Sequence, residues 1–84
     1  MKLSIVLPAY NEESTLEEII TKVRGTALPE GLAREIVIVN DGSQDRTEEI
    51  LGRFEGQAGI VIVHQSNRGK TAAILTGFKN ATGF

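Results

Sequence analysis

Three short runs of apolar, mostly β-branched residues stand at similar intervals along the chain. They cover Leu3–Leu7, Ile36–Val39 and Ile60–Val63, and none shows the strict apolar-polar alternation of a half-exposed strand. Continuous runs of this length are typical of strands in a parallel sheet whose two faces are both covered by helices. We therefore expect three strands, each buried on both faces.

The segment between the first two runs has the periodicity of a helix. Its apolar residues recur on one helix face at positions Leu16, Ile19, Ile20 and Val23. The stretch 14–17 begins with serine and ends with glutamate, the pattern of a capping box, which satisfies the first backbone N–H groups of a helix. We expect the helix to begin there and to end near Gly25.

Two further helices are expected after the second and third strands. Asp45 is the predicted N-cap of the first of them, and its buried side consists of Ile50, Leu51 and Phe54. The last helix should run from about Arg68 to Lys79, with Asn67 as its N-cap. The apolar residues of this helix that are available for packing are Ala72, Ala73, Leu75 and Phe78.

The resulting order is β-α-β-α-β-α over residues 1–84, without internal repeats. Because strands that alternate with helices pair in parallel through right-handed crossovers, this order predicts an α/β fold with a parallel sheet between two layers of helices. Ligands of such sheets bind at the carboxyl ends of the strands. The polar segments 8–12, 40–43 and 64–70 are expected at that edge.

Composition excludes several classes of function. A chain of 84 residues makes at most one small domain, and its formal charge of −2 with scattered Lys and Arg argues against a nucleic-acid partner. The chain has no cysteine, which excludes disulfides and thiolate chemistry and fits a reducing compartment. No apolar run approaches the length of a membrane span, about 18 residues. We therefore expect a cytoplasmic location.

Two nucleotide-binding motifs are incomplete in this sequence. Gly69-Lys70 between a strand and a helix resembles a phosphate loop, but that loop needs another glycine where His64 stands. A dinucleotide fold needs a glycine-rich turn after its first strand, and no glycine precedes Gly25. The sequence therefore argues against an ATPase of the phosphate-loop class and against a dehydrogenase.

Three longer motifs follow the predicted strands in order: SIVLPAYNEE, EIVIVNDGSQDRT and NRGKTAAILTGFKNATG. Together they resemble the nucleotide-binding half of family 2 glycosyltransferases, a group that includes dolichyl-phosphate and undecaprenyl-phosphate sugar transferases. The resemblance spans essentially the whole chain. It implies a three-layer, Rossmann-like GT-A fold, of which residues 1–84 are the N-terminal, nucleotide-sugar-binding part of a longer enzyme.

The resemblance also implies a role for five residues. Pro8 and Tyr10 would line the nucleotide base, Glu12 would approach the nucleoside, and Asp41 would accept hydrogen bonds from the base edge. Lys70 would face the base or the diphosphate, and Arg68 is a candidate for sharing that role. Because an ionised carboxylate only accepts hydrogen bonds, a base with ring N–H donors, uracil or guanine, suits this site better than adenine does.

Most of these residues have a structural alternative. Asp41 would begin an Asx turn, Tyr10 would pack over the strand ends, and Glu12 would complement the positive end of a helix dipole. Lys70 would be an exposed residue of the first helical turn. His64, the only histidine, is expected to be structural rather than a catalytic base.

Two departures from the family pattern limit what this chain is expected to do. Asn40 stands where an aspartate commonly precedes Asp41. The family's Asp-x-Asp, which holds Mg²⁺ or Mn²⁺ on the donor diphosphate, would lie beyond Phe84 with the acceptor region and the catalytic base, and Asp41 with Asp45 does not reproduce it. We therefore expect neither a metal site nor a catalytic residue in these 84 residues, and no sugar transfer by them alone.

By resemblance, the full enzyme transfers a sugar with inversion from a UDP- or GDP-sugar to an acceptor, expected to be a polyprenyl phosphate at the cytosolic face of a membrane. A non-catalytic nucleotide-binding module and an α/β interaction domain are the alternatives. In the family the next strand pairs beside the first, so Leu3–Leu7 would form a free sheet edge. Such edges recruit other strands, and self-association through the first strand is expected.

Overall fold

The computed structural model describes residues 2–82, which form three strands and three helices in strict alternation. The strands are β1 (Lys2–Ala9), β2 (Ala33–Asp41) and β3 (Ile60–Gln65), and the helices are α1 (Leu16–Gly25), α2 (Thr47–Gly52) and α3 (Lys70–Asn80). The strands are parallel and lie in the order β1-β2-β3. The predicted β-α-β-α-β-α order and parallel sheet are confirmed.

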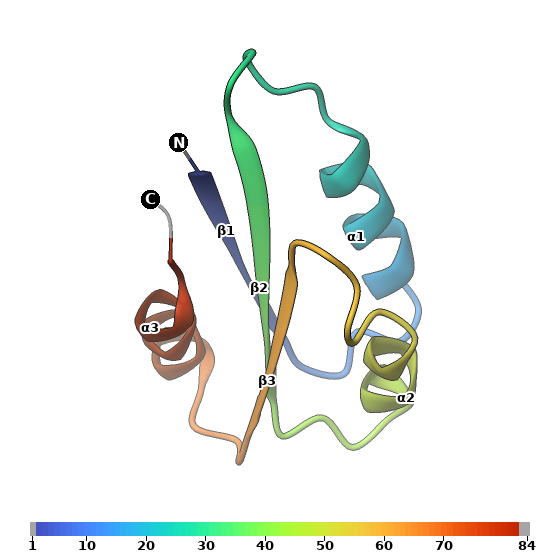
Figure 1. Cartoon of the computed structure of the whole chain (residues 1–84). Helices are drawn as coiled ribbons and strands as arrows, with labels where there is room; N and C mark the ends of the chain where they lie inside the picture. The colour runs from blue at the N-terminus through green and yellow to red at the C-terminus, as the bar shows by residue number, and fades with distance from the viewer. Residues whose placement is uncertain (1, 83–84) are drawn as a thin grey trace.

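The sheet lies between two layers of helices. Helices α1 and α2 lie on one face, and α3 lies on the other, against β1 and β2 (Figure 1). The three strands point the same way, so their carboxyl ends and the loops that follow meet at one edge, at the bottom of Figure 1. This edge is where the predicted polar segments come together.

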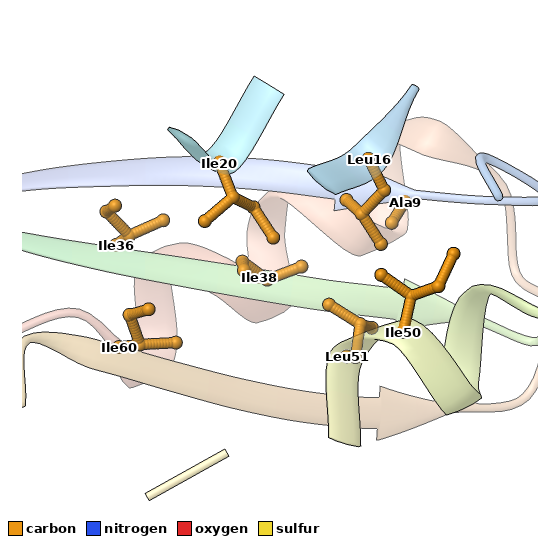
Figure 2. Close-up of a cluster of buried hydrophobic side chains, with 8 residues drawn as sticks. All are labelled: Ala9, Leu16, Ile20, Ile36, Ile38, Ile50, Leu51 and Ile60. Atoms are coloured by element: carbon orange, nitrogen blue, oxygen red, sulfur yellow. The ribbon is translucent and has the colours of Figure 1, made fainter. Parts of the chain in front are cut away.

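Alternate residues of β2 supply the two halves of the core, because successive side chains of a strand point to opposite faces. Ile36 and Ile38 lie in the larger cluster, under α1 and α2, whereas Val37 and Val39 pack with Ala73 of α3 on the other face. Figure 2 shows the larger cluster, whose buried members are Ala9, Leu16, Ile20, Ile36, Ile38, Ile50, Leu51 and Ile60. Burial of these two apolar clusters, one on each face of the sheet, holds the three layers together.

Burial differs between the strands. β2 is buried from Glu35 to Asp41, but most residues of β1 and β3 are only half-buried. Within residues 2–82, β1 and β3 each pair with a single neighbour, so they are the edges of the sheet. The prediction of two-sided burial is therefore confirmed for β2 and wrong for the other two strands.

The capping box predicted for α1 is wrong. The residue at the N-cap position is Thr15, which makes no side-chain capping bond; its hydroxyl donates to Glu12 Oε2 at 3.2 Å instead. The helix ends at Gly25, as predicted. The guanidinium group of Arg34 donates to the carbonyls of Val23, in the last turn, and of Thr26, just after the helix; this contribution from β2 is not evident in the local sequence.

Helix α3 begins two residues later than predicted and buries small residues against the sheet. Ala73 and Gly77 are its buried positions, whereas Leu75 and Phe78 are 54% and 63% exposed. The prediction that Leu75 and Phe78 would pack in the core is therefore wrong for residues 2–82. Because the residues of α3 that face the sheet are small, the helix backbone lies close to the strands.

At the far end of the sheet, a buried carboxylate connects β1 and β2 to the segment that follows α3. Glu35 accepts hydrogen bonds from Thr82 N at 2.9 Å, Thr82 Oγ1 at 2.8 Å and Ser4 Oγ at 2.8 Å. Lys2 Nζ lies 3.8 Å from Glu35 Oε2 and donates to Thr82 Oγ1 at 2.8 Å. These interactions, with the Thr82 backbone N–H foremost, lower the pKa of Glu35, so its charged form stabilises this end of the fold.

Gly77 sets the distance between α3 and β1. A Cβ atom at this position would overlap Val6 Cγ1 and lie 3.3 Å from Val6 Cβ. Val6 is β-branched and belongs to a strand, so its side chain has little freedom to move aside. Glycine is therefore required here by contact across the core rather than by backbone conformation.

We predict that Gly77→Ala lowers the free energy of unfolding by about 1–3 kcal/mol, the usual cost of overpacking. Helix propensity alone predicts the opposite sign, a gain of up to about 1 kcal/mol. Urea unfolding measures the difference, with Gly52→Ala in α2 as the control, because a Cβ at Gly52 meets nothing within 4 Å. A Gly77→Ala variant at least as stable as the parent would contradict this packing.

Candidate functional site

A cavity of about 600 Å³ opens at the carboxyl ends of the strands. Its wall comes from the end of β1 with the loop after it, from the end of β2, and from the start of α3; the lining residues are Pro8, Ala9, Tyr10, Glu12, Asp41, Asn67, Gly69, Lys70 and Ala73. All five residues predicted to bind a nucleotide are among them. The three motifs thus contribute to one concave surface.

Asp41 is the most constrained of the five residues, with a relative exposure of 3%. Its Oδ1 accepts hydrogen bonds from Gln65 Nε2 and from the backbone N–H of Arg68, both at 2.9 Å, and its Oδ2 accepts one from Gly69 N at 3.0 Å. The bond from Gln65, followed by that from Arg68, lowers the pKa of Asp41. The carboxylate is therefore ionised at neutral pH and holds the segment that leads into α3.

The N-cap predicted for α3 is wrong, because the N-cap position belongs to Gly69 and not to Asn67. Gly69 occupies the N-cap position and makes no side-chain capping bond, while the amides of Arg68 and Gly69 donate to Asp41 from the neighbouring strand. A charged acceptor forms stronger bonds than an amide oxygen does. The start of α3 is thus tied directly to the end of β2.

The turn after β2 is closed by Asn40 rather than by Asp41. Asn40 Oδ1 accepts a hydrogen bond from Ser43 N at 3.1 Å, and Asn40 Nδ2 lies 3.1 Å from His64 Nδ1. Since the amide oxygen is occupied by Ser43, Nδ2 donates and the histidine nitrogen accepts. The turn-forming role considered for Asp41 belongs to Asn40, and His64 has the structural role predicted for it.

Gly42, in the same turn, allows the loop after β2 to touch the loop before α3. Its φ is 71°, in the left-handed region, and a Cβ there would lie 2.6 Å from Asn67 N. Any other residue would be strained and would push these two loops apart.

Four hydrogen bonds join the loop after β1 to the loop after β2. They connect Asn11 N to Ser43 Oγ at 3.1 Å, Gln44 N to Asn11 Oδ1 at 2.8 Å, Glu12 N to Thr47 Oγ1 at 2.8 Å and Glu13 N to Asp45 Oδ2 at 3.2 Å. Backbone N–H groups are the donors throughout, so the side chains fix the path of both loops. The positions of Tyr10 and Glu12 relative to Asp41 follow from these bonds.

Asp45 and Thr47 each form one hydrogen bond at the start of α2 and another to the loop after β1. Asp45 Oδ1 accepts from Thr47 N at 2.9 Å, which is the capping interaction predicted for Asp45, although the assigned N-cap of α2 is Arg46. Thr47 is fully buried, and its hydroxyl accepts the Glu12 N–H. The sequence indicated the cap but gave no sign of the bonds to the neighbouring loop.

The remaining cavity residues leave polar or aromatic surface free for a ligand. Tyr10 is 46% exposed, so its ring is accessible rather than packed away over the strand ends. Lys70 is exposed in the first turn of α3, and none of the ion pairs found among residues 2–82 involves it. Together with acidic Glu12 and Asp41, the cavity offers an aromatic face, hydrogen-bond acceptors and one cation.

The residues that could bind a metal ion do not cluster. Within the described part of the chain, no group of three or more His, Asp or Glu side chains lies close enough together to hold one. These residues therefore do not fit the divalent cation that the resemblance implies. In the same part of the chain, no helix has the length and hydropathy needed to cross a membrane.

Comparison with known proteins identifies similar chains. A family model described as glycosyl transferase family 2 matches residues 4–83. An undecaprenyl-phosphate 4-deoxy-4-formamido-L-arabinose transferase from Pseudomonas aeruginosa is 40% identical over 96% of this chain and 25% of its own length. A dolichol-phosphate mannosyltransferase from Pyrococcus furiosus is 34% identical over 99% of this chain and 23% of its own length.

The fold is also similar to that of a solved protein. The crystal structure of S. aureus TarS 1-349 superimposes with a TM-score of 0.82 and 26% identity, over 99% of this chain and 25% of that one. The predicted GT-A, Rossmann-like arrangement is thereby confirmed. The chain spans about a quarter of the length of each of these three proteins.

We predict that Thr47→Val, which keeps the side-chain volume but removes the acceptor of the Glu12 N–H, lowers the free energy of unfolding by about 1–3 kcal/mol, the cost of an unsatisfied buried donor. Urea unfolding measures it, and Thr21→Val on the exposed side of α1 is the matched control. Thr47→Ser, which retains the hydroxyl, should lose less than Thr47→Val. If valine and serine were equivalent, the bond between the loops would not contribute to stability.

Proposed function

Because the chain belongs to glycosyl transferase family 2, we propose that its cavity binds the nucleotide diphosphate of a UDP- or GDP-linked sugar donor. The observation that carries this proposal is the meeting of Pro8, Tyr10, Glu12, Asp41 and Lys70, from three separate motifs, around one cavity. Its volume of about 600 Å³ lies within the usual range for small-molecule sites.

The chemistry of the lining suggests how the nucleotide is held. The accessible ring of Tyr10 stacks on the base beside Pro8, and Asp41 accepts a hydrogen bond from a base N–H. Glu12 accepts hydrogen bonds from ribose hydroxyls. The diphosphate lies toward Lys70, whose charge adds to the positive end of the α3 dipole.

For the whole protein, of which this chain is proposed to be the N-terminal part, we propose sugar transfer to a polyprenyl phosphate. The names of two relatives combine a sugar with undecaprenyl phosphate or with dolichol phosphate. An oxygen of the acceptor phosphate would attack the anomeric carbon from the face opposite the departing nucleotide diphosphate, which inverts the configuration. This reaction would take place at the cytosolic face of a membrane.

The parts needed for transfer lie largely outside the described residues. A divalent cation on the donor diphosphate would need ligands that residues 2–82 do not supply, and no catalytic base is assigned among them. This chain alone is therefore proposed to bind the donor nucleotide without transferring the sugar. Addition of Mg²⁺ or Mn²⁺ should change its nucleotide affinity little.

Nucleotide binding separates this proposal from its alternatives. Isothermal titration with UDP, GDP and ADP should give measurable binding of UDP or GDP and weaker binding of ADP. Equal affinity for all three would indicate a nucleotide-binding module that does not recognise the base. No detectable binding of any of the three nucleotides at millimolar concentration would favour an α/β interaction domain.

We predict that Lys70→Ala weakens the binding of UDP or GDP by about fivefold at low ionic strength, the scale of one charge near a helix start. The loss should shrink at high salt, because a partly exposed charge is screened. Lys79→Ala, at the other end of α3, is the matched control and should change neither affinity. A loss from Lys70→Ala that is independent of salt would contradict a direct electrostatic role.

Self-association through β1 remains a further proposal. Among the described residues β1 has a strand neighbour only in β2, so it forms one edge of the sheet. Two chains could pair their β1 strands in antiparallel fashion about a two-fold axis. Sedimentation over about a hundredfold concentration range should show a dimer that dissociates on dilution. A monomer at every concentration would contradict the proposal.

A further inference from the structure

The acceptor sites of Asp41 are almost fully used within the protein. An ionised carboxylate has two oxygens with about four acceptor sites between them. Oδ1 accepts from Gln65 Nε2 and Arg68 N, both at 2.9 Å, so both of its sites are filled. Oδ2 accepts only from Gly69 N at 3.0 Å, and one site remains. Asp41 is buried and lines the cavity, so the cavity is the side from which we expect a ligand to reach that site.

The bond from Gln65 is fixed in orientation. Gln65 Oε1 accepts a hydrogen bond from Thr76 Oγ1 of α3 at 2.6 Å, so the amide oxygen faces the helix and the amide nitrogen faces Asp41. A rotated amide would place its oxygen against the carboxylate, and the threonine hydroxyl would have to change from donor to acceptor. Thr76 therefore holds the Gln65 amide in the orientation in which its nitrogen donates to Asp41 Oδ1.

Nucleobases differ in the number of donors that they offer to a carboxylate. The Watson–Crick edge of guanine presents its ring N1–H and its exocyclic amino group side by side, and a carboxylate binds both only through its two oxygens. Uracil presents a single ring N–H, flanked by two carbonyl acceptors. One open site on one oxygen suits the edge of uracil and leaves a donor of guanine without a partner.

We infer that the cavity selects uridine over guanosine nucleotides and that Gln65 sets this preference by occupying Asp41 Oδ1. The inference rests on the proposed function, since it names the base of the same donor. In this arrangement uracil N3–H donates to Asp41 Oδ2, while Lys70, which lines the same cavity, stays beside the diphosphate. Gln65 does not bind the nucleotide itself; it is a positioning residue that acts through Asp41.

Titration of the 84-residue chain with UDP and with GDP tests the inference. The parent chain should bind UDP at least about tenfold more tightly than GDP, as expected when a buried donor would be left unpaired. Gln65→Met has a similar volume but no donor, so it opens a site on Oδ1, and the UDP-to-GDP affinity ratio should fall toward one. Thr76→Val, which frees the amide to rotate, should give an intermediate ratio.

The matched control is Gln57→Met, which replaces a glutamine that bonds to Arg24 and Arg53 rather than to the cavity, and it should keep the parent ratio. A structural defect would weaken the binding of both nucleotides equally, so the affinity ratio distinguishes an effect on positioning from an effect on folding. If Gln65→Met does not fold, the UDP-to-GDP affinity ratio of Thr76→Val tests the inference instead.

Three results would overturn the inference. GDP binding as tight as UDP binding in the parent would refute the base preference, while leaving nucleotide binding itself intact. An unchanged ratio in both Gln65→Met and Thr76→Val would remove Gln65 as its cause. If the parent chain bound neither UDP nor GDP, the proposed function would be overturned, and this inference with it.

Discussion

The carboxylate of Asp41 joins the three elements that meet at the carboxyl end of the sheet. It lies at the end of β2, and it accepts hydrogen bonds from Gln65 at the end of β3 and from the two amides that lead into α3. A charge that is 3% exposed is tolerated only when it is hydrogen-bonded, and here three donors bind it. The position of α3, and hence one wall of the cavity, depends on this group.

The rest of the site is arranged around this anchor by bonds between backbone and short side chains. The loop after β1 is held against the loop after β2 by Asn11, Ser43, Asp45 and Thr47. On the other side, Gly77 lets α3 lie close to β1. Bonds or packing within the protein therefore hold the elements on both sides of the cavity, and the ligand-facing groups are few. Such a separation between supporting residues and ligand-facing residues suits a binding site, because the supporting bonds fix the groups that contact the ligand.

Much of the fold could be predicted because apolar runs and helical periodicity are local properties of the sequence. The runs that became β1, β2 and β3 and the order of the helices needed no tertiary information. Burial of β1 and β3 could not be predicted, since it depends on which strand lies at the centre of the sheet. The exposed position of Phe78 could not be predicted for a similar reason, because α3 reaches the sheet through small residues.

The location of the site residues could also be predicted, because parallel strands bring their carboxyl ends together and the motifs resemble those of a known family. The bonds that support the site could not. Asp41 accepts a hydrogen bond from the amide of Gly69, 28 positions away in the sequence, and Glu35 accepts one from the amide of Thr82, 47 positions away. A polar residue in a sequence shows that it needs a partner, but not which distant amide provides it.

Hydrogen exchange at the amides of Arg68 and Gly69 tests the central claim that the Asp41 carboxylate holds the start of α3. In the parent chain at neutral pH, both amides should be protected, because each donates to that carboxylate. Asp41→Ala should speed their exchange by at least about tenfold while amides in the middle of β2 stay protected. Equal protection of Arg68 and Gly69 in the parent and in Asp41→Ala would contradict the claim.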